Sequence, residues 1–189
     1  MKVTLIGTGV AVPSPRRLSP ALLVEAGREK LLLDCGPDTL HGLVRAGLDH
    51  REVDRIILTH YHPDHTLGLP HFLFASRYEL EPRKKDVYLA GPPGLKKLLA
   101  GFRKIYPRWL EGRGYRVIET VIDEGGWSGP GWRMTAAGVS HNPESLAYRI
   151  EDENGTSLVF SGDTGYSESL IALAADCDLL ISECSFPDG

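Results

Sequence analysis

The sequence contains few cysteines, no long hydrophobic run and no excess of positive charge. Its three cysteines, Cys35, Cys177 and Cys184, are irregularly spaced, which argues against a disulfide framework or a CxxC zinc site and predicts buried thiols. No segment approaches the roughly 18 to 20 apolar residues of a membrane helix, so we expect a cytoplasmic protein without a membrane span. The formal net charge of −4 argues against a general nucleic-acid binder, because affinity for phosphate backbones needs clustered cations.

The composition is that of a single globular domain. The 189 residues are 42% hydrophobic and 24% charged, which is enough to bury a core and lies outside the disordered range. Apolar runs and alternation predict strands, and stretches with helical spacing lie between them. The predicted strands cover residues 2–6, 21–24, 30–33, 55–58, 86–89, 115–122, 132–139, 145–150, 157–161 and 179–182, and the predicted helices cover residues 38–46, 70–79, 95–102 and 167–175. This pattern indicates a strand-rich α/β fold.

Two segments rich in turn-forming residues interrupt the pattern. Glu153-Asn154-Gly155-Thr156 contains the Asn-Gly pair of a tight hairpin turn between two strands. Residues 125–132 hold four glycines, a proline and two tryptophans, and we expect a surface loop with one buried ring. Stacking of a tryptophan on substrate is the alternative interpretation of this loop.

The most informative stretch is His60-Tyr61-His62-Pro63-Asp64-His65, which places four potential metal ligands within six residues. It follows Arg55-Ile56-Ile57-Leu58-Thr59, a short β-branched and apolar run that predicts a buried strand. The cluster therefore lies at the carboxyl end of a strand, where open α/β sheets present ligand sites. His60 and His62 are two residues apart, so in extended backbone both imidazoles point to the same side and can bind one ion.

Asp64 and His65 are adjacent and must diverge, which suits a second ion about 3.5–4 Å from the first, as in two-metal hydrolytic sites. Asp64 also precedes a stretch with helical spacing, so it can act as the N-cap of that helix. A capping aspartate beside surface histidines is the alternative, but three histidines around an aspartate are hard to obtain from packing alone. His41, His50 and His71 lack ligand partners at useful spacing and are expected to be solvent or packing residues.

The HxHxDH pattern of residues 60–65 resembles the signature of the metallo-β-lactamase-fold superfamily of metal hydrolases. Other segments resemble that superfamily in the same order, namely Leu32-Leu33-Asp34-Cys35-Gly36, Gly138-Val139-Ser140-His141-Asn142 and Ser161-Gly162-Asp163-Thr164-Gly165. Within the superfamily the chain is most similar to the ribonuclease Z-like branch, through segments 6–9, 13–17, 90–95 and 180–186. The resemblance spans residues 1–189.

The resemblance implies an αββα sandwich and a dinuclear metal site. The implied metal ligands are His60, His62, Asp64, His65, His141 and Asp163, with Asp163 bridging the two ions. Asp34 would orient a motif histidine, as carboxylates around metal-bound imidazoles do. The cofactors would be two divalent ions holding a bridging hydroxide, zinc in preference because the donors are rich in imidazole, with manganese or iron as alternatives. Asp64 would serve as the base, and Glu183 would protonate the leaving group.

The family pattern continues beyond the features found here. Members of the branch carry, after the glutamate segment, a histidine that pairs with the glutamate and a final metal-binding histidine, whereas no histidine follows His141. We therefore expect residues 1–189 to form one metallo-β-lactamase-type domain that is incomplete at the C-terminal end, lacking its last helix and strand. Truncation and completion by another chain both remain open at this point, as does a homodimer.

The substrate is less well defined by the sequence than the metal site. Ribonuclease Z holds transfer RNA through a long basic arm, and no such insertion is evident here. Arg83-Lys84-Lys85, Lys96-Lys97, Arg103-Lys104 and Arg108 form a modest basic stretch that solvated surfaces explain equally well. The leading hypothesis is a dinuclear zinc phosphodiesterase of ribonuclease Z-like type, an endonuclease if transfer RNA is the substrate. The alternatives are hydrolysis of another ester, such as a cyclic phosphate, sulfate or carboxylic ester, and a non-catalytic metal-binding scaffold.

Overall fold

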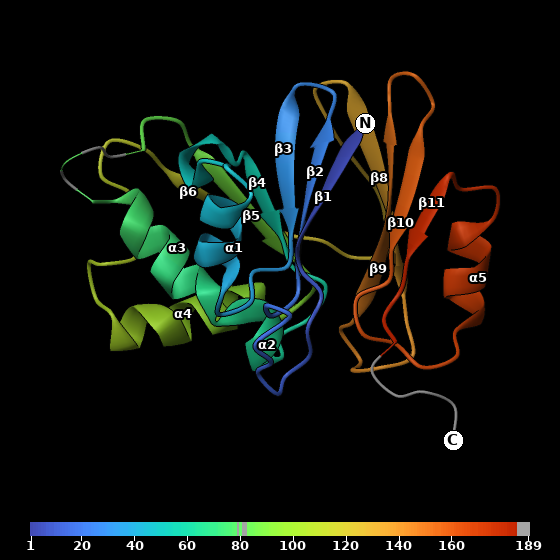
Figure 1. Ribbon diagram of the computed structural model, residues 1–189, viewed down its shortest axis with the longest axis horizontal. Helices are drawn as coiled ribbons and strands as arrows, with labels where there is room; N and C mark the ends of the chain where they lie inside the picture. The colour runs from blue at the N-terminus through green and yellow to red at the C-terminus, as the bar shows by residue number, and fades with distance from the viewer. Residues whose placement is uncertain (79, 81–82, 185–189) are drawn as a thin grey trace.

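Two β-sheets pack face to face with helices on both outer sides, in the computed structural model of the protein (Figure 1). The structure describes residues 1–78, 80 and 83–184. The layer order is helices, sheet, sheet, helix, which is the predicted αββα sandwich. No helix among these residues is long and apolar enough to cross a membrane.

The N-terminal sheet contains six strands in the order β1-β2-β3-β4-β5-β6. Its strands are β1 (Lys2–Gly7), β2 (Ala21–Ala26), β3 (Glu29–Leu33), β4 (Arg55–Ile57), β5 (Val87–Gly91) and β6 (Val117–Val121). The first three strands pair antiparallel, and β3 to β6 pair parallel, with Leu33 opposite Ile57 and Ile57 opposite Ala90. Parallel neighbours end at the same edge, so the loops after β3 and β4 lie side by side.

The C-terminal sheet contains five strands in the order β11-β10-β9-β8-β7. Its strands are β7 (Gly125–Gly129), β8 (Trp132–Gly138), β9 (Leu146–Asp152), β10 (Ser157–Phe160) and β11 (Leu179–Ile181). All pairs are antiparallel except β10 with β11. The predicted Asn-Gly turn connects β9 to β10, with Gly155 at φ +81.

The helices cover the two outer faces. The N-terminal sheet carries α1 (Thr39–Arg45), the 3₁₀ turn η1 (His50–Glu52), α3 (Gly68–Ser76) and α4 (Leu95–Ile105), and the C-terminal sheet carries α5 (Glu168–Ala174). The short helix α2 (Pro63–Thr66) lies beyond the ends of the strands, at the bottom of Figure 1. Side chains of one strand point alternately to opposite faces. Ile56 accordingly packs under the helices with Phe72, whereas Ile57 packs between the sheets with Met134. Both faces of β4 are buried, as its apolar sequence predicts.

The structure corrects three predictions. Residues 125–129 form β7 rather than a loop, because their backbone pairs with β8 and an edge strand needs little from its side chains. Asp64 is not an N-cap, because α2 begins at Pro63 and His62 takes the cap position, so Asp64 lies within the first turn. Only Cys35 of the three thiols is buried, and Cys184 is exposed. Glu79 of the predicted second helix, and residues 185–186 of the glutamate segment, lie outside the described residues.

Candidate metal centre

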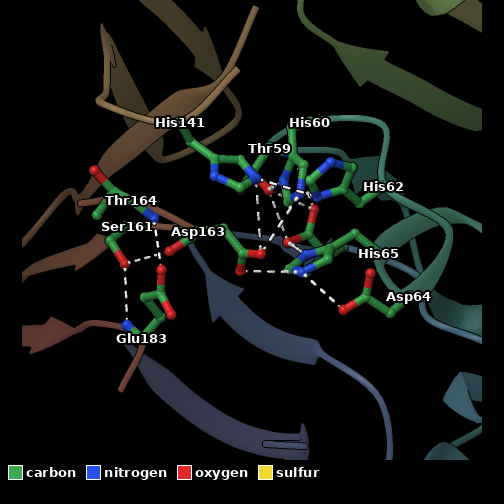
Figure 2. Close-up of polar contacts among 12 residues, drawn as sticks. Thr59, His60, His62, Asp64, His65, His141, Ser161, Asp163, Thr164 and Glu183 are labelled. Atoms are coloured by element: carbon green, nitrogen blue, oxygen red, sulfur yellow. Dashed lines mark hydrogen bonds and ion pairs between the residues drawn. The ribbon is translucent and has the colours of Figure 1, made fainter. Parts of the chain in front are cut away.

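Polar side chains from both sheets converge at one edge of the sandwich, and Figure 2 shows them pointing toward one another. From the N-terminal sheet, Asp34 directly follows β3, and His60 follows β4. From the C-terminal sheet, His141 follows β8 and Asp163 follows β10. The strand ends bring together segments that are more than a hundred residues apart in sequence.

Four side chains form a compact group of metal donors. His60, His62, His141 and Asp163 each offer one ligand atom, and these atoms all lie within 4.8 Å of one another. His141 Nε2 is 3.1 Å from His62 Nδ1, close to the roughly 3.3 Å that separates two ligands about 2.05 Å from a tetrahedral ion. The structure therefore assembles three imidazoles and one carboxylate from four of the six predicted ligands.

The other two predicted ligands lie on the far side of Asp163. His65 Nε2 is 3.1 Å from Asp163 Oδ1 and 3.6 Å from Asp64 Oδ2. The other oxygen, Asp163 Oδ2, lies 3.8 Å from His60 Nε2 and 3.9 Å from His141 Nε2. One carboxylate thus presents one oxygen to each of two histidine groups, as a bridging ligand would.

Two buried nitrogens test whether a cation fits here. His60 Nε2 and His65 Nε2 are buried and make no hydrogen bond of good geometry among the described residues, although Asp163 Oδ1 lies 3.1 Å from His65 Nε2. A buried polar atom without a partner costs about 1–3 kcal/mol, so both nitrogens require another partner. Imidazole nitrogens and carboxylate oxygens are ligands of divalent ions such as zinc. The residues present fit a bound metal ion.

The nearby carboxylates affect the pKa values of the histidines unequally. Burial, with His65 close by, lowers the pKa of His60 to about 4. Burial also opposes a charge on His65, but Asp34 and Asp163 outweigh it and raise the pKa of His65 to about 10. Burial likewise opposes ionisation of Asp163, yet its contact with His65 holds its pKa below the ordinary value. Negative charge is therefore concentrated around His65, which favours a cation there.

Asp34 and Glu183 contact residues of the metal centre without belonging to the donor group. Asp34 is fully buried, and its Oδ2 is 2.7 Å from His65 Nδ1, so this carboxylate contacts a motif histidine as predicted. Glu183 lies beyond β11, and its carboxylate accepts a hydrogen bond of 2.9 Å from the Thr164 peptide N–H (Figure 2). This hydrogen bond connects Glu183, the predicted proton donor, to the loop that contains Asp163.

Two polar residues of this region were not predicted from the sequence. The Thr59 hydroxyl lies between Asp34 and His60, and the Asn142 amide nitrogen lies 3.1 Å from His62 Nε2. Each is a chain neighbour of a predicted ligand, and that adjacency is the only signal the sequence offers. His41, His50 and His71 are not members of this donor group.

Comparisons with known proteins agree with the fold. The sequence matches the family described as Metallo-beta-lactamase superfamily over residues 14–184. A ribonuclease Z from Bradyrhizobium diazoefficiens is 31% identical, covering 98% of this chain and 77% of its own length. A ribonuclease Z from Mycobacterium bovis is also 31% identical, covering 96% of this chain and 69% of its own length.

Solved structures show the same fold. The metallo-beta-lactamase fold protein YhfI from Bacillus subtilis superposes with a TM-score of 0.82 at 24% identity, over 97% of this chain and 72% of that one. The short form of human tRNase Z superposes with a TM-score of 0.77 at 24% identity, over 95% of this chain and 76% of that one.

The fold and the donor group, taken with these likenesses, define the class of the protein as a metal-dependent hydrolase with an αββα sandwich. The chain belongs to the metallo-beta-lactamase superfamily, in its ribonuclease Z-like branch. The predicted resemblance and fold class are confirmed.

Proposed function

We propose that the protein is a dinuclear metal phosphodiesterase of ribonuclease Z-like type. The observation that best supports this proposal is the position of Asp163, whose Oδ1 lies near His65 and whose Oδ2 lies near His60 and His141. His60, His62 and His141 would hold the first ion, and Asp64 and His65 the second, with Asp163 between them. A carboxylate shared by two dications is a recurring feature of two-metal hydrolytic sites.

Zinc is the proposed metal, with manganese and iron as alternatives. The donors combine four imidazoles with two carboxylates, and imidazole suits zinc and iron, whereas carboxylate suits manganese. When bound, such ions lower the pKa of water toward neutrality and polarise the substrate oxygens.

The protein side chains have separate tasks in this reaction. Asp64 lies in the first turn of α2, 15% exposed, where its carboxylate can accept a proton from a water molecule at the centre. His141 is the more accessible of the histidines, 27% exposed, so it can contact a phosphate oxygen as charge develops there. Glu183, held by Thr164, is the candidate that protonates the leaving oxygen.

The proposed substrate is an RNA phosphodiester, and transfer RNA is the first candidate. Two relatives that are 31% identical over most of this chain are named ribonuclease Z. A cytoplasmic location belongs to the same proposal, because all three cysteines are free thiols, as is usual in a reducing compartment.

Hydrolysis of bis-p-nitrophenyl phosphate tests the phosphodiesterase activity. We expect turnover that requires added zinc or manganese and that Asp163→Ala removes, because that variant takes one ligand from each ion. Arg28→Ala, on the turn between β2 and β3 at the opposite end of the strands, is the matched control and should retain full activity. Lack of metal-dependent turnover in the unmodified protein would sink the proposal. Precursor transfer RNA, assayed in parallel, tests the substrate.

A small phosphate ester is the second candidate substrate. The alignment with the Bradyrhizobium relative runs over 237 positions, more than the 189 residues of this chain, so that relative carries segments that this chain lacks. A chain without such segments has less surface for a large RNA. Faster hydrolysis of a cyclic nucleotide or another small ester than of precursor transfer RNA would favour this candidate.

A further inference from the structure

Thr59 joins the two halves of the metal centre. It lies between β4 and the HxHxDH segment and is 1% exposed. Its peptide N–H donates to Asp34 Oδ1 at 2.8 Å, and its carbonyl accepts from the Leu146 N–H at 3.0 Å. The first bond ties Thr59 to β3, and the second ties it to β9 in the other sheet. The position of the side chain is therefore fixed from both sheets.

The Thr59 hydroxyl has two neighbours but only one proton to donate. It lies 2.9 Å from Asp34 Oδ2 and 3.0 Å from His60 Nδ1. An ionised carboxylate can only accept, and hydrogen bonds to a charged acceptor are roughly twice as strong as neutral ones. The hydroxyl proton therefore goes to Asp34. The hydroxyl oxygen is then left to accept a proton from His60 Nδ1.

Because the Thr59 hydroxyl donates to Asp34 and accepts from His60 Nδ1, the tautomer of His60 is determined. A neutral imidazole carries one N–H, and with that hydrogen on Nδ1 the lone pair is on Nε2. Nε2 is the buried atom that has no hydrogen-bond partner among the described residues and that belongs to the donor group. The other tautomer would bury an Nε2–H that lies 3.8 Å from Asp163 Oδ2, too far for a hydrogen bond. The Nδ1–H form is the one that leaves no donor unpaired.

The same carboxylate acts on a second histidine. Asp34 Oδ2 lies 2.7 Å from His65 Nδ1, so it accepts the Nδ1–H there and leaves Nε2 directed at Asp163. Asp34 thus contacts His65 directly and reaches His60 through Thr59. One buried charge orients a ligand for each of the two proposed ions.

The whole side chain of Thr59 supports the Asp163 loop. Gly162 has φ +59, and a Cβ there would lie 2.7 Å from Thr59 Cβ, which no side chain could tolerate. The loop therefore rests directly on Thr59, one residue before Asp163. Only the hydroxyl also contacts Asp34 and His60, so substitutions can separate its hydrogen bonds from the packing of the side chain against Gly162.

We infer that Thr59 is a positioning residue that holds His60 in its metal-binding tautomer by relaying the Asp34 carboxylate, and that it supports the Asp163 loop at the same time. This inference rests on the proposed metal centre but does not depend on which ester is hydrolysed. A serine keeps the hydroxyl, a valine keeps the shape, and an alanine keeps neither.

The test reads the His60 tautomer by ¹⁵N NMR in metal-free protein and the zinc affinity by chelator competition. In the unmodified protein and in Thr59→Ser we expect the Nδ1–H form, and in Thr59→Val loss of that preference with zinc bound roughly 10- to 100-fold more weakly, as for other residues that support metal ligands. Thr39→Val is the matched control, because its hydroxyl donates to Gly36 O at 2.7 Å and is equally buried.

Retention of the Nδ1–H tautomer and of full zinc affinity in Thr59→Val overturns the inference. If that variant does not fold, Thr59→Ala is measured instead, and the same two results decide. An Nε2–H tautomer in the unmodified protein also overturns it. Because the tautomer is read without metal or substrate, a protein inactive on phosphodiesters would leave this test intact.

Discussion

Cys35 shows how burial can make a thiol unreactive. It lies next to Asp34 in sequence, is fully buried and has a free thiol. Burial raises the pKa of Cys35 to about 12. The thiolate is the reactive form, so near neutral pH this thiol is both protonated and enclosed. Cys35 is not a member of the donor group found among the described residues.

Alkylation with iodoacetamide, followed by mass spectrometry, checks this prediction. In the folded protein at a pH of about 8 we expect Cys184 to react first and Cys35 last, because Cys184 is exposed. In denaturant the difference should disappear, which serves as the control. Rapid labelling of Cys35 in folded protein would contradict the buried position.

At the level of residues, candidate ligands that lie close together in the sequence were easier to predict than isolated ones. Four ligands within six positions can be recognised from spacing, because their geometry is set by a short piece of backbone. His141 and Asp163 are isolated in sequence, so only the family resemblance predicted them. Thr59 was missed because its role depends on Asp34, which lies 25 residues earlier. No local pattern reports such a contact.

At the level of elements, apolar strands were predicted better than glycine-rich ones. The residues of β4 are buried on both faces, so its sequence shows its surroundings directly. Strand β7 forms because its backbone pairs with that of β8. Its glycines have low strand propensity, so the sequence does not indicate this pairing. The cap of α2 was missed for a similar reason, since His62 takes a position that small polar residues usually occupy.

The cap of α5 offers a test at this scale. Ser167 has extended backbone, and its hydroxyl accepts a hydrogen bond of 3.3 Å from the Leu170 N–H. Ser167→Ala should lower the free energy of unfolding by about 1 kcal/mol, the usual cost of losing an N-cap. Urea titration measures the change, and Ser128→Ala on exposed β7 is the control. An unchanged midpoint in Ser167→Ala would show that the cap contributes nothing.

At the level of the whole molecule, a hydrogen-bonded cluster around an ion pair joins the sheets at the end away from the metal centre. Arg55 of β4 binds Glu29 through Nε at 2.7 Å and Nη2 at 2.9 Å, and Trp132 of β8 donates to the same carboxylate at 2.8 Å. The Arg55 guanidinium also lies over the rings of Tyr88 and Trp127, at 4.4 and 4.8 Å. Sequence patterns could not predict this cluster, since its members come from five strands.

Arg55→Met should destabilise the protein, because it leaves Glu29 charged in a nearly closed site. Arg55 is 7% exposed, and removing one partner of a buried pair typically costs about 3–5 kcal/mol. Urea denaturation measures the loss. Zinc affinity of the folded fraction should be unchanged, because this pair lies at the beginning of the strands and the donors lie beyond their ends. Weaker zinc binding without loss of stability would contradict this separation.

The two proposed metal positions differ in the donors that surround them, and this difference should appear in solution. Three imidazoles and Asp163 meet at the first position, whereas Asp64, His65 and Asp163 meet at the second. Zinc titration of metal-free protein by calorimetry should therefore show two events, a tight one that His62→Ala removes and a weaker one that His65→Ala removes. Zinc at a hundred times its Kd should stabilise the fold by about 2.7 kcal/mol, so EDTA should lower the Tm. Less than one ion bound per chain, or one event that both variants affect equally, would contradict two unequal positions and would favour a scaffold that binds metal weakly.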